Sequence, residues 1–171
     1  NINIETDSIV DMPNYNIAPS QRIIAIKFEA NTLARFQQMK WGLDPPTFQG
    51  DSIERFTDRL NLFNARADKI SNSLPWQSLY DNSRCLIPCS SYYEWTKSSM
   101  FGKSSTPFMI QMKDKTPFYL AGLYTTTIDA FNKNPTASCA IITTEANSLQ
   151  STIHKRMPVI IPIQNVSTWL N

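Results

Sequence analysis

The sequence predicts a mixed α+β fold, in which a largely antiparallel, curved and barrel-like β-sheet is flanked by short helices. Strand-like segments rich in β-branched and aromatic residues dominate the 171-residue chain, and turn residues separate them. Strands and helices do not alternate regularly, which argues against a parallel, doubly wound sheet. No internal repeat and no linker rich in Gly or Ser interrupts the pattern, so a single domain is expected over residues 1–171.

Individual elements follow from local patterns. The expected strands cover residues 22–28, 35–43, 84–88, 91–96, 107–113, 118–127, 138–144 and 156–162. Helical spacing of Ile53, Phe56 and Leu60 predicts a helix over 51–63, which begins with a capping-box pattern. A second, short helix is expected over 145–154, and the last residues read as part of an amphipathic helix.

Composition narrows the class of protein. Apolar residues make up 42% and charged residues 18% of the chain, which is typical of a globular domain. No apolar run approaches the length of a membrane span, and the first residues lack the pattern of a signal peptide. Three cysteines are an odd number, so an intracellular, reducing setting is expected. A net charge of +2 permits nucleic-acid binding only through a local basic patch.

The cysteines do not suggest a metal site. Cys85 and Cys89 have the spacing C-x₃-C, but structural zinc sites usually show two such short pairs. Both lie in apolar, strand-like sequence, and buried core cysteines are expected. A Cys139/His154 dyad for thiol catalysis is conceivable, but a nucleophile in the middle of a strand would be shielded. No cofactor and no metal are therefore expected.

Four short stretches could carry chemistry. In "SYYEWT" the carboxylate of Glu94 sits among aromatic residues, and an apolar surround raises the pKa of a carboxyl group toward the range of acid–base catalysis. In "FNAR" an extended backbone would place Asn64 and Arg66 on one face, where a guanidinium could clamp a phosphate. "TIHKRMPVI" holds the sequence's one histidine, His154, and "MKWGLDPP" holds Trp41, which could stack on a base. Taken singly, each has an ordinary structural explanation: a solvated sheet edge, a surface turn, a capping histidine or a core tryptophan.

The order of these stretches resembles one family. The segments "YNIAPS", "KWGL", "FNAR", "RCLIPCSSYYEW", "PFMI", "AGLY", "AIITTEAN" and "IHKRMPVII" follow one another as in the SOS-response-associated peptidase (SRAP) family. The resemblance covers the chain from about residue 15. It implies the barrel-like SRAP fold and a protein that shields abasic sites in single-stranded DNA. It also implies a covalent thiazolidine crosslink, formed by the cysteine that follows the initiator Met.

The resemblance assigns roles to residues of this chain. It implies that Asn64 orients the terminal cysteine or its adduct, that Glu94 moves protons, and that His154 assists the same chemistry. Arg66 would grip a phosphate beside the lesion. Further DNA contacts are assigned to residues in neighbouring segments, namely Pro19, Trp41, Thr143 and Arg156. The expected partner is single-stranded DNA with abasic sites. The protein is expected to be a monomer, located in the cytoplasm if it is bacterial and in the nucleus if it is eukaryotic.

One feature departs from the family pattern. No "MCGR"-like start is present, and none of the three cysteines can be the terminal nucleophile. Both ends are expected to be incomplete, although a member without crosslinking ability is an alternative. Three activities stay open: crosslinking to abasic sites, thiol peptidase or autopeptidase activity, and non-catalytic binding of single-stranded DNA. The base-separating aromatic of the family corresponds to Thr47, with Phe48 as a substitute.

Overall fold

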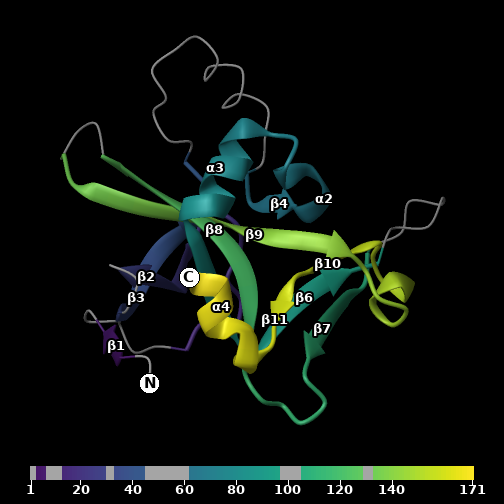
Figure 1. The fold of residues 1–171 in the computed structure, drawn as a ribbon. Helices are drawn as coiled ribbons and strands as arrows, with labels where there is room; N and C mark the ends of the chain where they lie inside the picture. Colours follow the sequence, from purple (N-terminus) through teal and green to yellow (C-terminus); the bar gives the residue numbers. More distant parts are fainter. Residues whose placement is uncertain (1–2, 7–12, 30–32, 45–61, 97–104, 129–132) are drawn as a thin grey trace.

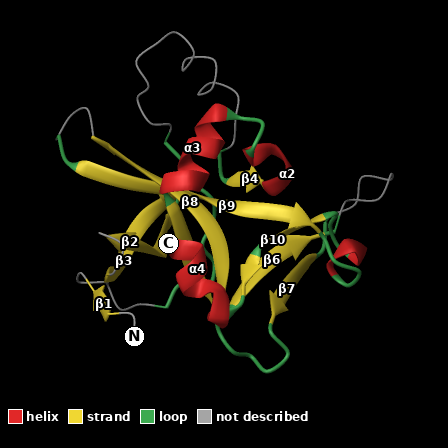
Figure 2. Ribbon diagram, viewed as in Figure 1, coloured by secondary structure: helices red, strands yellow, loops and turns green. Residues whose placement is uncertain are grey.

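The computed structural model describes residues 3–6, 13–29, 33–44, 62–96, 105–128 and 133–171. A curved sheet forms the body, and short helices cover parts of its outer surface (Figure 1 and Figure 2). The expected α+β barrel-like class is confirmed. No helix within the described residues is long and apolar enough to cross a membrane.

Five strands close the barrel. They are β2 (Arg22–Glu29), β3 (Leu33–Trp41), β5 (Arg84–Cys89), β8 (Phe118–Ile128) and β9 (Pro135–Glu145). Antiparallel pairing runs from β3 through β2, β5 and β8 to β9. A ring with an odd number of strands cannot alternate direction throughout, so one junction must be parallel. That junction is β3–β9, where Lys40 pairs with Ser138 and Trp41 with Cys139.

Shorter strands extend this ring. Two of them are parallel to their partners: β1 (Asn3–Thr6) pairs with β3, whereas β4 (Asn64–Arg66) pairs with β9. The antiparallel strands β10 (Arg156–Pro158) and β11 (Ile160–Ile161) pair with β9 and β8. A separate hairpin of β6 (Ser91–Trp95) and β7 (Pro107–Gln111) stands beside β10 (Figure 1).

The core explains why several strands are apolar on both faces. Alternate residues of β5 and β9, such as Cys85, Ile87 and Cys139, pack into one buried cluster. The residues between them face outward and are buried by helices. Leu86 packs with Leu170 of α4 (Val166–Leu170), and Ala140 and Ile142 pack beneath α2 (Ala67–Ile70) and α3 (Leu74–Asn82).

Most predicted strands are present within one to three residues of their expected bounds, and two predictions need correction. The helix expected over 145–154 is wrong, because β9 continues to Glu145 and only a 3₁₀ turn, η1 (Gln150–Thr152), follows. The single strand expected over 156–162 is divided at Val159 into β10, which pairs with β9, and β11, which pairs with β8. The 3₁₀ turn η2 (Ile163–Asn165) follows. The amphipathic C-terminal helix is confirmed as α4. The helix expected over 51–63 and the pair Thr47 and Phe48 fall on or across residues 45–61, outside the described part.

Candidate functional site

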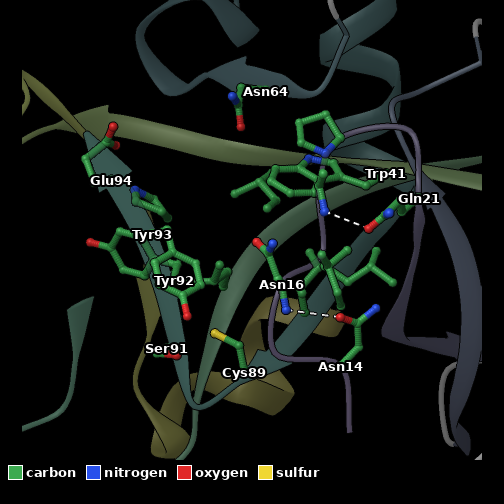
Figure 3. Close-up of a pocket in the computed structure, with 18 of the residues that line it drawn as sticks. Asn14, Asn16, Gln21, Trp41, Asn64, Cys89, Ser91, Tyr92, Tyr93 and Glu94 are labelled. Carbon is green, nitrogen blue, oxygen red and sulfur yellow. Dashed lines mark hydrogen bonds between the residues drawn. The ribbon is translucent and has the colours of Figure 1, made fainter. Parts of the chain in front are cut away.

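A large pocket opens beside the barrel where the hairpin, the 13–21 segment and the ends of β4 and β10 meet. Its volume is about 1160 Å³. All eight residues proposed from the sequence line this pocket: Pro19, Trp41, Asn64, Arg66, Glu94, Thr143, His154 and Arg156. Figure 3 shows Asn64 above the pocket, Glu94 on one wall and Trp41 on the opposite wall. Their spatial convergence is a property of the fold, while their roles stay predictions.

The acid–base wall joins β6 to the loop after η1. Glu94 and His154 are 60 positions apart in sequence, yet Glu94 Oε2 lies 3.8 Å from His154 Nδ1. That distance is too long for a hydrogen bond, but the carboxylate would attract the ring when the imidazole carries a proton on both nitrogens. The other carboxylate oxygen, Oε1, accepts the backbone N–H of Trp95 at 3.0 Å. Glu94 is therefore held at one oxygen, and the other accepts no hydrogen bond from the part of the chain that the structure describes.

The histidine ring is oriented by its own loop. Nδ1 of His154 lies 3.2 Å from the backbone N of Arg156 and 3.1 Å from its carbonyl O. The backbone N–H donates to Nδ1 in one tautomer, and Nδ1–H donates to the carbonyl in the other. Both arrangements leave Nε2 without a partner among the described residues. The ring can therefore exchange a proton with a group in the pocket.

A buried glutamine connects the two halves of this wall. Gln150 is only 5% exposed, and its Oε1 accepts the hydroxyl of Tyr92 at 3.0 Å. The carbonyl of Gln150 also accepts the backbone N–H of His154 at 3.0 Å. Desolvation, with the nearby charge of Glu94, raises the pKa of Tyr92 to about 12, so this hydroxyl stays protonated and donates. The strand that carries Glu94 is thereby tied to the loop that carries His154.

The basic wall is built on β4 and β10. Arg66 pairs in register with Thr143 of β9, which fixes its backbone. Its guanidinium donates from Nε and Nη2 to the two oxygens of Asp68, at 3.2 and 2.6 Å. In β4, Asn64 and Arg66 are exposed and Ala65 between them is buried, which confirms that Asn64 and Arg66 share an exposed face. The amide of Asn64 has no hydrogen-bond partner in the described part of the chain.

Arg156 is placed differently from Arg66. Its Nε and Nη2 donate to the hydroxyl and the carbonyl of Thr143, and its Nη1 lies 3.2 Å from Asp68 Oδ1. The Arg156 side chain is 14% exposed, against 52% for Arg66. All three guanidinium nitrogens of Arg156 thus face protein groups. Its assignment to DNA binding stays a prediction, and the geometry favours a supporting role.

The aromatic wall completes the pocket. The indole N–H of Trp41 donates to the carbonyl of Phe63 at 3.0 Å, and its ring is half-buried. Tyr93 and Trp95 also line the pocket, their rings 6.4 Å apart, and they are 40% and 48% exposed. In the sequence these two residues read only as part of the aromatic surround of Glu94, and no role was assigned to them. Exposed aromatic rings beside a basic residue are typical of surfaces that bind single strands.

The thiols are not arranged as nucleophiles. Cys85 and Cys139 are fully buried in the barrel core, as expected, and burial raises the pKa of Cys139 to about 12. This burial excludes the Cys139/His154 dyad. The prediction that Cys89 is a buried core residue is wrong, because Cys89 is only partly buried and lines the pocket. Desolvation raises its pKa to about 12 as well, so it remains a neutral thiol.

Other residues were missed by sequence reasoning. Asp68 was overlooked because an acidic residue two positions after an arginine reads as ordinary surface, although a pair so close on a turn can form a local ion pair. Arg22, which also lines the pocket, reads as the polar start of a strand. Lys155, the neighbour of Arg156 in sequence, is exposed and absent from the pocket lining. No group of three or more His, Cys, Asp or Glu side chains is arranged to hold a metal ion in the described segments.

Known proteins share this sequence and fold. Residues 2–171 match the family described as SOS response associated peptidase (SRAP). Abasic site processing protein YoqW of Bacillus subtilis is 36% identical over 162 residues, which cover 93% of this chain and 67% of that protein. Abasic site processing protein YMR114C of Saccharomyces cerevisiae is 28% identical and matches 86% of this chain and 37% of its own length. The chain spans about two thirds of the length of the Bacillus relatives.

Solved structures give the same result for the fold. A protein from Bacteroides thetaiotaomicron superimposes with a TM-score of 0.73 at 29% identity, covering 89% of this chain and 63% of that one. A protein from Bordetella bronchiseptica reaches 0.77 at 20% identity, with 98% and 80% covered, and supports the fold alone. Sequence and fold agree over nearly the whole chain, and the protein therefore belongs to the SOS response associated peptidase (SRAP) family.

Proposed function

We propose that this protein processes abasic sites, binding single-stranded DNA in the pocket and forming a thiazolidine crosslink through an N-terminal cysteine outside the 171 residues. The observation that carries the proposal is the convergence of Asn64, Glu94 and His154 in one pocket with the exposed Arg66 beside them. Relatives that share 34–36% of the aligned sequence are named abasic site processing proteins, which supports the substrate.

The proposed reaction makes two bonds in turn. The α-amine of the cysteine adds to the ring-opened aldehyde of the abasic sugar, and loss of water gives an imine. The thiol then adds across the C=N bond, its proton passing to nitrogen, and closes the thiazolidine. An α-amine has a pKa near 8, so roughly a tenth is free base at pH 7. The thiol traps the imine without any cofactor.

The polar residues of the pocket suit these steps. Loss of water requires a proton on the departing hydroxyl, and closing the ring moves a proton from sulfur to nitrogen. Glu94 has one oxygen open to the pocket, and His154 has Nε2 available, so they can share these transfers. The amide of Asn64 can hold the cysteine in position, and Arg66 can bind the phosphate beside the lesion.

A single-stranded oligonucleotide with one abasic site tests the proposal. The 171-residue chain should bind it in a fluorescence anisotropy titration, but no adduct should survive denaturing electrophoresis. A longer version with the native start, processed to expose an N-terminal cysteine, should form a stable adduct. A crosslink formed by the 171-residue chain through Cys85, Cys89 or Cys139 would contradict the mechanism, and failure to bind single-stranded DNA would contradict the function.

A peptidase is the second candidate, favoured by the description of the family. It would use the same terminal cysteine, acting on a peptide or on the protein's own N-terminus. The longer version decides between the two, since a peptidase turns over peptide whereas a crosslinking enzyme is consumed by one abasic site. A non-catalytic DNA binder would be indicated if the native start proved to lack the cysteine.

A further inference from the structure

Asp68 occupies an unexpected place for an acidic residue, at the edge of a pocket that would take a polyanion. It lies in α2, two residues after Arg66, and its carboxylate is 49% exposed. Both oxygens accept from the Arg66 guanidinium, and Oδ1 also faces Nη1 of Arg156. One carboxylate thus links an arginine of β4 to an arginine of β10.

The geometry of this pair leaves Arg66 able to bind a second anion. Asp68 occupies the edge of the guanidinium formed by Nε and Nη2. Nη1 has no partner among the described residues, so the remaining edge can donate to a phosphate. An arginine side chain loses much rotamer freedom when it is fixed, and a carboxylate that fixes it beforehand removes that cost from DNA binding.

Asp68 is in turn held by the fold. Arg156 is anchored to Thr143 through two hydrogen bonds, and Thr143 is the register partner of Arg66. The side chain of Arg66 is therefore fixed at both ends. Its backbone is held by pairing with β9, and its guanidinium is held by the carboxylate of Asp68, which Arg156 connects to Thr143 of β9. The arginine favours the charged carboxylate and lowers the pKa of Asp68 to about 2, so the pair is charged on both sides at neutral pH.

We propose that Asp68 is a positioning residue, which holds the Arg66 guanidinium in the orientation that binds a DNA phosphate. This rests on the proposed function, because it concerns the same pocket. The proposal makes a prediction opposite in sign to simple electrostatics. Removing a negative charge near a DNA site should strengthen binding if charge alone matters. Removing Asp68 should weaken binding, because Arg66 is released to many rotamers.

The test compares Asp68→Asn with the wild-type 171-residue chain. Affinity for a single-stranded oligonucleotide is measured by anisotropy between about 50 and 200 mM salt. Asp68→Asn should weaken binding about three- to tenfold, since it loses the charge-assisted pair. Asp68→Glu should restore most of the affinity. The matched control is Asp81→Asn, which makes the same change of charge at an exposed residue outside the pocket lining and should not weaken binding.

A double-mutant cycle separates positioning from folding. In an Arg66→Ala background, Asp68→Asn should have no further effect on affinity, because the group that it positions is gone. Binding by Asp68→Asn equal to or tighter than wild type overturns the proposal and leaves the DNA-binding function intact. An equal loss in both backgrounds also overturns it, because it indicates a defect unrelated to Arg66. If the wild-type chain does not bind single-stranded DNA, the proposed function itself fails.

Discussion

The basic wall and the acid–base wall of the pocket are held in different ways. On the basic wall, Arg66, Asp68 and Arg156 form a continuous chain of charged contacts at 2.6–3.2 Å. On the acid–base wall, Glu94 and His154 approach to 3.8 Å without a direct hydrogen bond. Their positions are set indirectly, through backbone groups and through the partly buried Tyr92–Gln150 hydrogen bond.

This difference fits different tasks. A group that binds a phosphate gains from being fixed before the ligand arrives, because less conformational entropy is lost on binding. A pair that transfers protons must keep at least one atom each free for the reacting group. A direct hydrogen bond from His154 Nδ1 would occupy Oε2 of Glu94, the carboxylate oxygen that makes no hydrogen bond among the described residues. The open 3.8 Å gap therefore leaves the acid–base wall able to serve an adduct.

The largest expected effect comes from breaking the acid–base wall. Glu94→Gln keeps the shape of the side chain but cannot give or take a proton, so crosslinking by the longer version should slow by about 10²- to 10⁴-fold. Single-turnover kinetics on a denaturing gel measure the rate. DNA affinity should change little, and Asp81→Asn should leave both quantities unaltered. An unchanged crosslinking rate would remove Glu94 from the mechanism.

A large chemical effect is also expected at Cys89, whose thiol faces the same pocket. With its pKa raised to about 12, only about 10⁻⁴ of it is thiolate at pH 8, against roughly a tenth for a thiol with the ordinary pKa of 9. Alkylation by iodoacetamide should therefore be about 10³-fold slower in the folded protein than in urea, as followed by mass spectrometry. Fast alkylation of native Cys89 would show a reactive thiol and reopen its role as a nucleophile.

The raised pKa of the Cys89 and Cys139 thiols also makes the stability of the fold depend on pH. A raised pKa means that the folded protein keeps the thiol proton between about pH 9 and 12 while the unfolded chain releases it. The free energy of unfolding should accordingly fall as pH rises through this range. Below pH 9 both states are protonated at these thiols, and the burial of Cys89 and Cys139 brings no pH dependence there.

Sequence patterns predicted the parts of this molecule better than their connections. Strand segments were recognisable because β-branched and aromatic residues mark them locally. The parallel β3–β9 junction was not, since it follows from closing a ring of five strands. The helix expected over 145–154 failed because pairing of Glu145 with Arg156 overrides the local helical pattern.

The candidate site shows the same limit. Asn64, Glu94 and His154 were found because their segments resemble a family, and the fold brings them to one pocket. Asp68 was not found, because only its contacts distinguish it, and they join two arginines that are 90 positions apart in sequence. Local sequence cannot reveal which arginine stays exposed and which becomes enclosed by Thr143.

That distinction between the arginines gives the smallest expected effect. Arg66→Ala should weaken binding to any single-stranded sequence and reduce the log–log salt slope by about 0.7, the value for one phosphate contact.

Arg156→Ala should leave that salt slope nearly unchanged, because the Arg156 guanidinium already faces Thr143 and Asp68. Its loss should instead cost about 1–3 kcal/mol of stability, since hydrogen bonds of a largely buried charge are removed. For a domain of this size that corresponds to a melting temperature lower by roughly 2–12 °C. Anisotropy titrations at several salt concentrations, together with thermal melts of both variants, measure the two quantities. If Arg156→Ala flattens the salt slope as much as Arg66→Ala does, both arginines contact phosphate, and the basic wall is a binding surface throughout rather than one binding residue with its support.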